Sequence, residues 1–296
     1  TMPRSHCPRL IRAHLMDKIS TFTIKKMSNI QKGDKKLIRS WMMYDWANSV
    51  YPLIISSAIF PILFETQTSV KNEAGVTIYD TVSFFGREFH NTEFYAYVIC
   101  LSYIVVALIS PLLSGIADAG GKRKLFMQFF CFMGAISSGL LYFFNTPPIG
   151  ELGQSPFSIN WSMLPLFFGS IGFWASLVFY NAYLPEIAHP EQQDSASAKG
   201  FIFGYSGSIL LLLLSLVMIN KPELFGLPNA GFATRVTFLI VGVWWFGFAQ
   251  ITYAKLPNNV YNRKPAKDFI WKGLHELKIV AKELKQHPEL KLFLSS

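Results

Sequence analysis

The sequence predicts an all-α polytopic membrane protein with six membrane-spanning helices. Of the 296 residues, 51% are hydrophobic and only 15% are charged, whereas soluble proteins have about 25% charged residues. The apolar residues gather in six runs, each close to the ~20 residues that a helix needs to cross the hydrocarbon core. Lysine and arginine lie almost entirely outside these runs. These three observations together exclude an ordinary soluble helical domain.

The six runs lie at residues 43–64, 93–117, 124–144, 161–184, 201–219 and 232–254. The run SGSILLLLLSLVMI is typical, because it has no polar face at helical period. Prolines interrupt three of the runs, at Pro52, Pro61, Pro111 and Pro165. Proline breaks a helix in water but is tolerated in a membrane bundle, where neighbouring groups satisfy the freed carbonyls.

The basic residues predict the orientation of the chain. The formal net charge is +9, from 27 Lys and Arg against 18 Asp and Glu. With the N-terminus in the cytoplasm, the loops on the outer side hold only Lys71, Arg87, Lys221 and Arg235. Cytoplasmic segments of membrane proteins carry such an excess of Lys and Arg. The charge therefore predicts a lipid bilayer as partner, and we expect no nucleic acid.

Four regions follow from this pattern. Residues 1–42 are expected to form a basic cytoplasmic tail, and residues 43–254 the six-helix transmembrane bundle. Residues 255–291 form a predicted linker whose apolar stripe (Ile270, Leu274, Leu277, Ala281 and Leu284) indicates an amphipathic helix. That helix either lies on the membrane surface or the bundle ends, or is a solvated linker. Residues 292–296 look like the start of a truncated seventh span, so we expect a fragment.

Catalytic and metal chemistry has no evident residues. Cys7, Cys100 and Cys131 are far apart in the sequence, which disfavours a zinc site or a disulfide framework. We find no Walker loop, no HExxH motif and no Ser–His–Asp set. We therefore expect no enzyme activity, no cofactor and no metal.

The second and third runs are joined by SPLLSGIADAGGKRKLF. Asp118, Gly121, Lys122 and Arg123 match the acid, glycine and two bases of a signature that the major facilitator superfamily carries between helices 2 and 3. Ser114 and Ala119 depart from it. The resemblance implies that this loop closes the cytoplasmic side by charge pairing, and the absence of a base at Ala119 implies a weaker or different closure. The alternative is a turn with topology-setting charge.

Three further stretches, YDWANSVYPLIISSAIFPILFE, YNAYLPEIA and GFIFGYSGSILLLLL, resemble the vacuole-effluxer-like branch of that superfamily over about residues 40–254. This branch holds bacterial permeases of unknown substrate and fungal vacuolar amino-acid effluxers. The resemblance implies the N-terminal, six-helix half of a major facilitator fold, with the C-terminal half missing. It implies a secondary transporter of a small organic solute, with amino acids the best guess and a coupling proton a further candidate partner. A six-span binding or sensory protein without transport is the alternative.

The resemblance also implies where the solute path lies. In the superfamily, helices 1 and 4 line the central cavity. Their buried amides and hydroxyls need hydrogen-bond partners, which a solute could supply intermittently. The candidate cavity residues are Asn48, Ser49, Tyr51, Ser56, Tyr180 and Asn181. The compact loops resemble bacterial members, which favours the bacterial cytoplasmic membrane, with the vacuolar membrane as the alternative.

Several charged and small residues have more than one interpretation. Asp45 caps or packs its helix, pairs with a basic loop residue such as Arg123 in a gate, or handles solute or protons. Glu186 is a solvated helix-end acid or part of the cytoplasmic gate. Gly200, Gly204 and Gly207 form a small-residue face, which lets helices approach closely.

Overall fold

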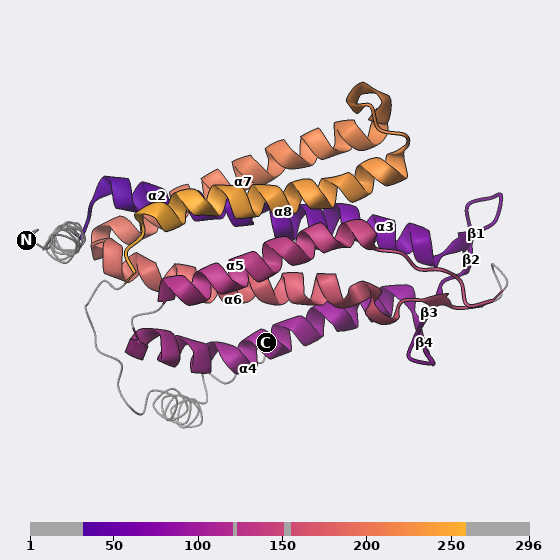
Figure 1. Ribbon diagram of the computed structural model, residues 1–296, viewed down its shortest axis with the longest axis horizontal. Coiled ribbons are helices and arrows are strands. Elements are labelled where there is room, and N and C mark those ends of the chain that lie inside the picture. Colours follow the sequence, from indigo (N-terminus) through magenta and orange to yellow (C-terminus); the bar gives the residue numbers. More distant parts are fainter. Residues whose placement is uncertain (1–31, 121–122, 151–154, 259–296) are drawn as a thin grey trace, which may run out of the picture.

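The computed structural model describes residues 32–120, 123–150 and 155–258, without the side chains of residues 112 and 115–120. In this part of the chain six helical stretches are long and apolar enough to cross a membrane, which confirms the predicted fold class. They run side by side along the long axis of the molecule (Figure 1). They are α2 (Lys35–Asn48) with η1 (Tyr51–Ala58) and α3 (Ile59–Thr68), α4 (Asn91–Gly120), α5 (Arg123–Leu140), α6 (Leu164–Ile187), α7 (Pro190–Asn220) and α8 (Ala230–Lys255).

Two helices begin earlier than the apolar runs predicted. The first begins at Lys35 rather than 43, because the Asp34 side chain accepts a hydrogen bond from the Lys36 amide at 2.8 Å and caps it. The fifth begins at Pro190 rather than 201, after a capping box between His189 and Gln192. The added turns are polar, so apolar periodicity did not reveal them. The predicted tail of residues 1–42 therefore contains the first turns of a helix.

The first span is irregular in its middle. Residues Tyr51–Ala58 form a π-helical segment between α2 and α3. Pro52 and Pro61 lack the N–H groups that would continue the α-helical pattern, and Tyr95 Oη on α4 donates to the Ser56 carbonyl oxygen at 2.9 Å. A side chain of a neighbouring helix thus satisfies part of the backbone that the prolines disturb.

The loops at one end of the bundle contain short strands, which the sequence analysis did not predict. β1 (Val70–Lys71) pairs with β2 (Thr77–Tyr79), and β3 (Thr81–Phe84) pairs antiparallel with β4 (Arg87–His90). β5 (Phe157–Ser158) joins β3 in parallel and links the loops before α4 and α6. Short 3-10 turns, η2 (Leu141–Phe143), η3 (Asn160–Met163) and η4 (Pro222–Phe225), complete this end, which lies away from the start of α2 (Figure 1).

The interior is packed through glycines. A Cβ atom at Gly172 of α6 would lie 2.6 Å from the Cα of Gly134 on α5, and one at Gly242 of α8 would lie 2.6 Å from the Ala135 carbonyl oxygen. Real Cβ contacts are not this short, so glycine is required where these backbones meet.

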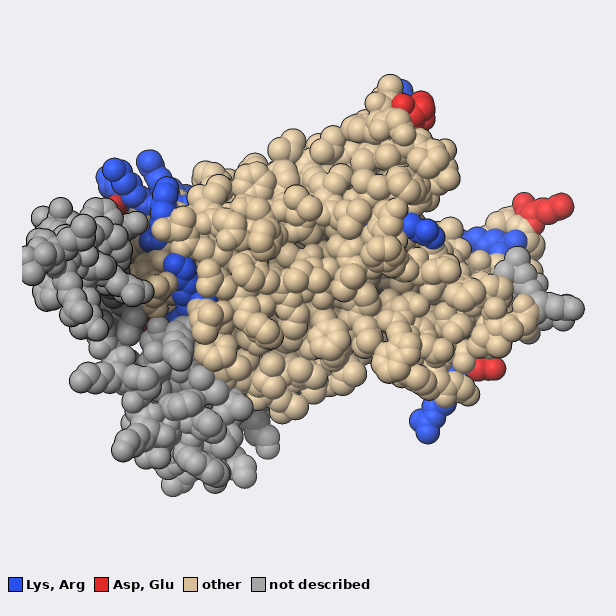
Figure 2. Space-filling view, viewed as in Figure 1, with Lys and Arg blue, Asp and Glu red and all other residues tan. Residues whose placement is uncertain are grey.

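The outer surface separates apolar sides from charged ends. Leu108, Ile136 and Val243 are among many large apolar side chains that are exposed, and the sides of the bundle carry few charges in Figure 2. One end, called here the basic end, holds the start of α2, the α4–α5 and α6–α7 connections and the end of α8. Its described cations are Lys32, Lys35, Lys36, Arg39, Arg123, Lys124, Lys199 and Lys255. This distribution is what a bilayer requires.

Candidate functional site

A buried carboxylate connects α2 with α6 near the basic end. Tyr180 Oη donates a 2.6 Å hydrogen bond to Asp45 Oδ2, and Asp45 is only 8% exposed. Trp41 stacks on the Tyr180 ring, with centroids 4.2 Å apart and planes 7° apart, while Trp41 Nε1 donates to the Tyr180 carbonyl oxygen at 2.9 Å. Trp41 is itself only 2% exposed, so it packs inside the bundle.

The predicted small-residue face of α7 lies against the same part of α2. A Cβ atom at Gly200 would lie 2.4 Å from Asp45 Oδ2, and one at Gly204 would lie 2.4 Å from Ser49 Oγ. One at Gly207 would lie 2.9 Å from the Trp46 ring. The structure therefore places α7 close beside Asp45, and side chains at these positions would displace the carboxylate, the hydroxyl or the indole.

Two candidate cavity residues already have partners within the chain. Tyr51 Oη lies 2.9 Å from Ser170 Oγ and donates to the Leu166 carbonyl oxygen at 3.2 Å. Tyr51 is buried, and Ser56 is half-buried with its carbonyl bound to Tyr95. The side chains of Tyr51 and Tyr95 therefore join η1 to α6 and α4.

The two candidate asparagines have opposite environments. Asn48 is 1% exposed, and its Nδ2 has no hydrogen-bond partner. Asn181 is exposed, although its neighbour Tyr180 is buried. A buried amide without a hydrogen-bond partner is energetically costly. Asn48 could therefore gain a hydrogen bond from a solute, whereas the Asn181 side chain lies on the outer surface of α6.

The candidate gating residues include one ion pair. Arg123 at the start of α5 pairs with Glu186 near the end of α6, and its guanidinium also donates to the Ala182 carbonyl oxygen at 3.2 Å. Their side chains are 16% and 9% exposed. The adjacent Lys124 Nζ donates to the Leu256 carbonyl oxygen at 3.0 Å. The ends of α5, α6 and α8 are thereby tied together at the basic end.

The remaining gating residues are less defined. The hypothesis that Asp45 pairs with Arg123 does not fit, since the carboxylate accepts from Tyr180 and the guanidinium lies at Glu186. Asp118 lies in the last turn of α4. Gly121 and Lys122 fall outside the described residues, as do residues 259–296, for which the sequence analysis predicted an amphipathic linker helix and the start of a seventh span.

No metal site forms in the described part of the chain, where no three His, Cys, Asp or Glu side chains come together. Of the two cysteines described there, Cys100 is exposed and Cys131 is buried, and both are free.

Sequence reasoning missed several residues that build this site. Ser170 and Leu166 bind Tyr51, and Trp41 holds Tyr180. The spacing of Trp41, Tyr44 and Asn48 places them on one face of α2, which could have indicated that this tryptophan is buried. Partners on α6 could not have been identified, because they depend on which helices adjoin.

A bundle of six candidate spans with a buried carboxylate, an internal ion pair and glycine-mediated helix contacts defines the class, a polytopic membrane protein. The chain belongs to the vacuole effluxer Atg22-like family, because a model of that family matches residues 33–296. This confirms the resemblance to the vacuole-effluxer-like branch that the three sequence stretches carry.

Relatives of both predicted kinds are found. The chain is 29% identical to the uncharacterized MFS-type transporter YxiO of Bacillus subtilis, over 90% of this chain and 56% of YxiO. It is 23% identical to autophagy-related protein 22 of Pyricularia oryzae, over 71% of this chain and 40% of that protein. The chain thus spans about half the length of the curated relatives it matches. No solved structure is significantly similar to it.

Proposed function

We propose that this chain is the N-terminal half of a secondary transporter that moves a small organic solute by alternating access. Family membership and the relative named an MFS-type transporter support this. The structural observation that carries the proposal is the hydrogen bond from Tyr180 to Asp45, between the first and fourth spans. In alternating access, two halves of the protein rock about a site near the midplane and expose it to each side in turn.

Asp45 would recognise positive charge. A carboxylate out of water is costly unless it is paired, and Asp45 accepts its hydrogen bond from the neutral phenol of Tyr180. A proton or the ammonium of an amino acid would neutralise it. Asn48, one turn further along α2, offers its unmet Nδ2 donor to an acceptor such as a carboxylate. Together these groups support amino acids as the solute class and a proton as coupling ion.

Arg123 and Glu186 would belong to the gate. Their ion pair and the Lys124–Leu256 contact hold the ends of α5, α6 and α8 together. When the basic end opens, these two contacts would either break or stay intact while the three helix ends move together. Asp118, Gly121 and Lys122 complete the proposed gate, because they match the superfamily signature beside Arg123.

The basic end would face the cytoplasm of a bacterial cell, with the vacuolar membrane as the alternative site. Excess Lys and Arg on one side of the membrane supports this orientation. This orientation is tested with single cysteines at Val76 and Ser195 in a chain without its native cysteines. An impermeant thiol reagent is added outside the cells. Labelling of Val76→Cys alone is expected, and labelling of Ser195→Cys alone would reverse the orientation.

The decisive functional experiment uses the full-length natural protein in proteoliposomes. Radiolabelled amino acids, sugars and sugar phosphates are offered with and without a pH gradient. The proposal expects uptake or efflux of an organic solute, with amino acids strongest and the gradient stimulating flux. Solute binding without flux would contradict it and support the alternative of a binding or sensory protein.

A further inference from the structure

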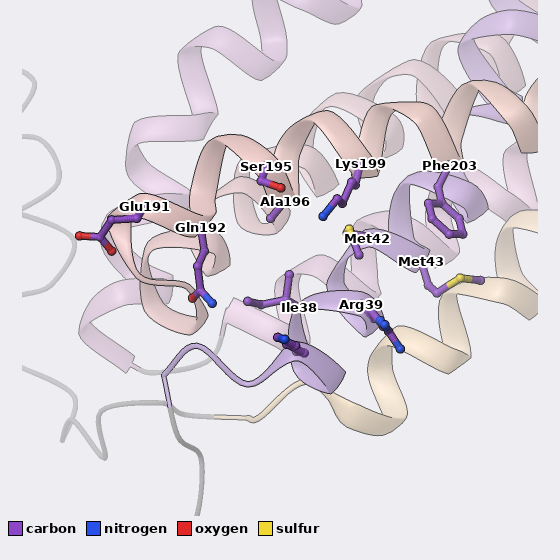
Figure 3. Close-up of a pocket in the computed structure, with 11 residues that line it drawn as sticks. Ile38, Arg39, Met42, Met43, Glu191, Gln192, Ser195, Ala196, Lys199 and Phe203 are labelled. Carbon is purple, nitrogen blue, oxygen red and sulfur yellow. The ribbon is translucent and has the colours of Figure 1, made fainter.

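A groove of about 840 Å³ lies between the starts of α2 and α7 at the basic end. Figure 3 shows Arg39 and Ile38 on α2, and Gln192 and Lys199 on α7, at its sides. Three cations line it in all: Lys35, Arg39 and Lys199. All three are exposed, so their charges are available to a ligand.

No acid in the described part of the chain forms an ion pair with the three groove cations. The ion pairs there involve Lys71, His90 and Arg123. The acid that lines the groove is Glu191, which points outward in Figure 3. The residues that line the groove therefore carry a net positive charge, which would attract an anionic group.

Apart from Gln192 and Ser195, the uncharged residues of the lining are apolar. Ile38, Met42, Met43 and Phe203 line the groove beyond the cations. Phe203 is 44% exposed, and its ring meets the edge of Trp46, with centroids 6.5 Å apart. Trp46 in turn stacks on Trp244 of α8. Because Phe203 falls within the apolar run 201–219, the groove crosses the boundary between the charged end and the lipid-facing side of the bundle.

We infer that this groove binds an anionic phospholipid. The phosphate lies between Arg39 and Lys199, with Lys35 at the outer edge, and an acyl chain follows Met43 and Phe203. Charge complementarity requires an anion, and the apolar lining selects a lipid over a soluble phosphate, which would leave those side chains uncovered. A bound lipid would join α2 to α7 beside Gly200, where the two helices approach each other at Asp45.

Lipid binding by the full-length protein tests this inference without any transport assay. Native mass spectrometry compares phosphatidylglycerol with phosphatidylcholine for the wild type and for a double variant, Arg39→Gln with Lys199→Gln. Each basic residue near a membrane strengthens anionic lipid binding about fivefold, so the double variant should lose about 25-fold in affinity for phosphatidylglycerol. The matched control, Arg87→Gln with Lys221→Gln, removes two exposed cations at the other end and should stay within about twofold.

Three further arms keep the test decisive. Arg39→Lys with Lys199→Arg should retain binding, and millimolar inorganic phosphate should not displace the lipid. Photoactivatable phosphatidylglycerol should label the segments around Met43 and Phe203 in the wild type. Unchanged lipid affinity in the Gln variant, displacement by phosphate, or labelling confined to other segments would overturn the inference. Displacement would indicate a site for a soluble anion instead.

Discussion

Tyr180 on α6 donates a hydrogen bond from its hydroxyl to Asp45 Oδ2 on α2 at 2.6 Å, in a contact that is closed on one side by Gly200 of α7. Three spans therefore meet at one carboxylate. Since a charge inside a membrane protein is costly and usually functional, we expect solute or proton binding to act on helix packing at this contact.

Replacing Asp45 with Asn removes the negative charge of this side chain but keeps its size and shape. The amide keeps an acceptor for Tyr180 but can neither bind a proton nor carry a negative charge. We expect a folded protein whose flux falls at least about tenfold and no longer responds to a pH gradient, a loss of 1.4 kcal/mol or more. Asp194→Asn, which changes an exposed acid on α7, is the control and should transport normally. A normal pH response in Asp45→Asn would remove the carboxylate from the coupling mechanism.

Adding one methyl group at Gly200 should disturb the same contact from α7. The new Cβ would lie 2.4 Å from Asp45 Oδ2, so the carboxylate must move away from Tyr180 or the helices must separate. Overpacking of this kind costs about 1–3 kcal/mol. Gly247→Ala on α8 is the matched control, since nothing lies within 4 Å of its Cβ position. Unfolding in a sodium dodecyl sulfate titration compares them, and equal midpoints would contradict the expected close approach.

Neutralising either member of the Arg123–Glu186 pair should destabilise the bundle by about 3 kcal/mol, because the partner is left charged and largely buried. The control is the exposed pair Lys71–Glu65, 3.2 Å apart, where Lys71→Gln should cost about 0–1 kcal/mol. The measurement is unfolding free energy in mixed detergent for both single variants and the double variant. Additive effects in that cycle would show that the pair does not couple α5 to α6.

The two asparagines should respond differently to leucine. Asn48→Leu removes a buried donor that has no partner, so stability should not fall, although flux should decrease if a solute uses that donor. Asn181→Leu changes an exposed side chain and should leave this half equally stable while also lowering flux. Thermal unfolding and flux are measured on the same preparations. Wild-type flux in both variants would exclude both asparagines from the solute path.

How far the sequence could predict this structure depends on the kind of interaction. The six spans were predictable, because a helix in lipid must be long and apolar. The length of an apolar run in the sequence shows this directly. Helix starts at Lys35 and Pro190 were not, since their first turns are polar and are stabilised by caps rather than by burial. The strand at residues 157–158 depends on pairing with a distant loop, whereas the strands within residues 70–90 pair in local hairpins.

In the candidate site, too, single residues could be predicted from the sequence, but their contacts could not. Asp45 and Tyr180 could each be singled out as polar residues beside apolar runs, but their hydrogen bond depends on how α2 packs on α6. For the same reason Arg123 could be offered only as one possible partner of Asp45, whereas the structure pairs Arg123 with Glu186. The contact between Gly134 and Gly172 gives no periodic signal at all. Contacts between single residues that are far apart in the chain cannot be predicted from one sequence alone.

The role of the Tyr180–Asp45 contact in transport is tested most directly by solute flux through the full-length protein with Tyr180→Phe. This change keeps the ring that stacks on Trp41 and removes only the hydroxyl that donates to Asp45. We predict a folded variant whose flux in proteoliposomes falls at least about tenfold below the wild type. Flux equal to that of the wild type would contradict a working role for this contact.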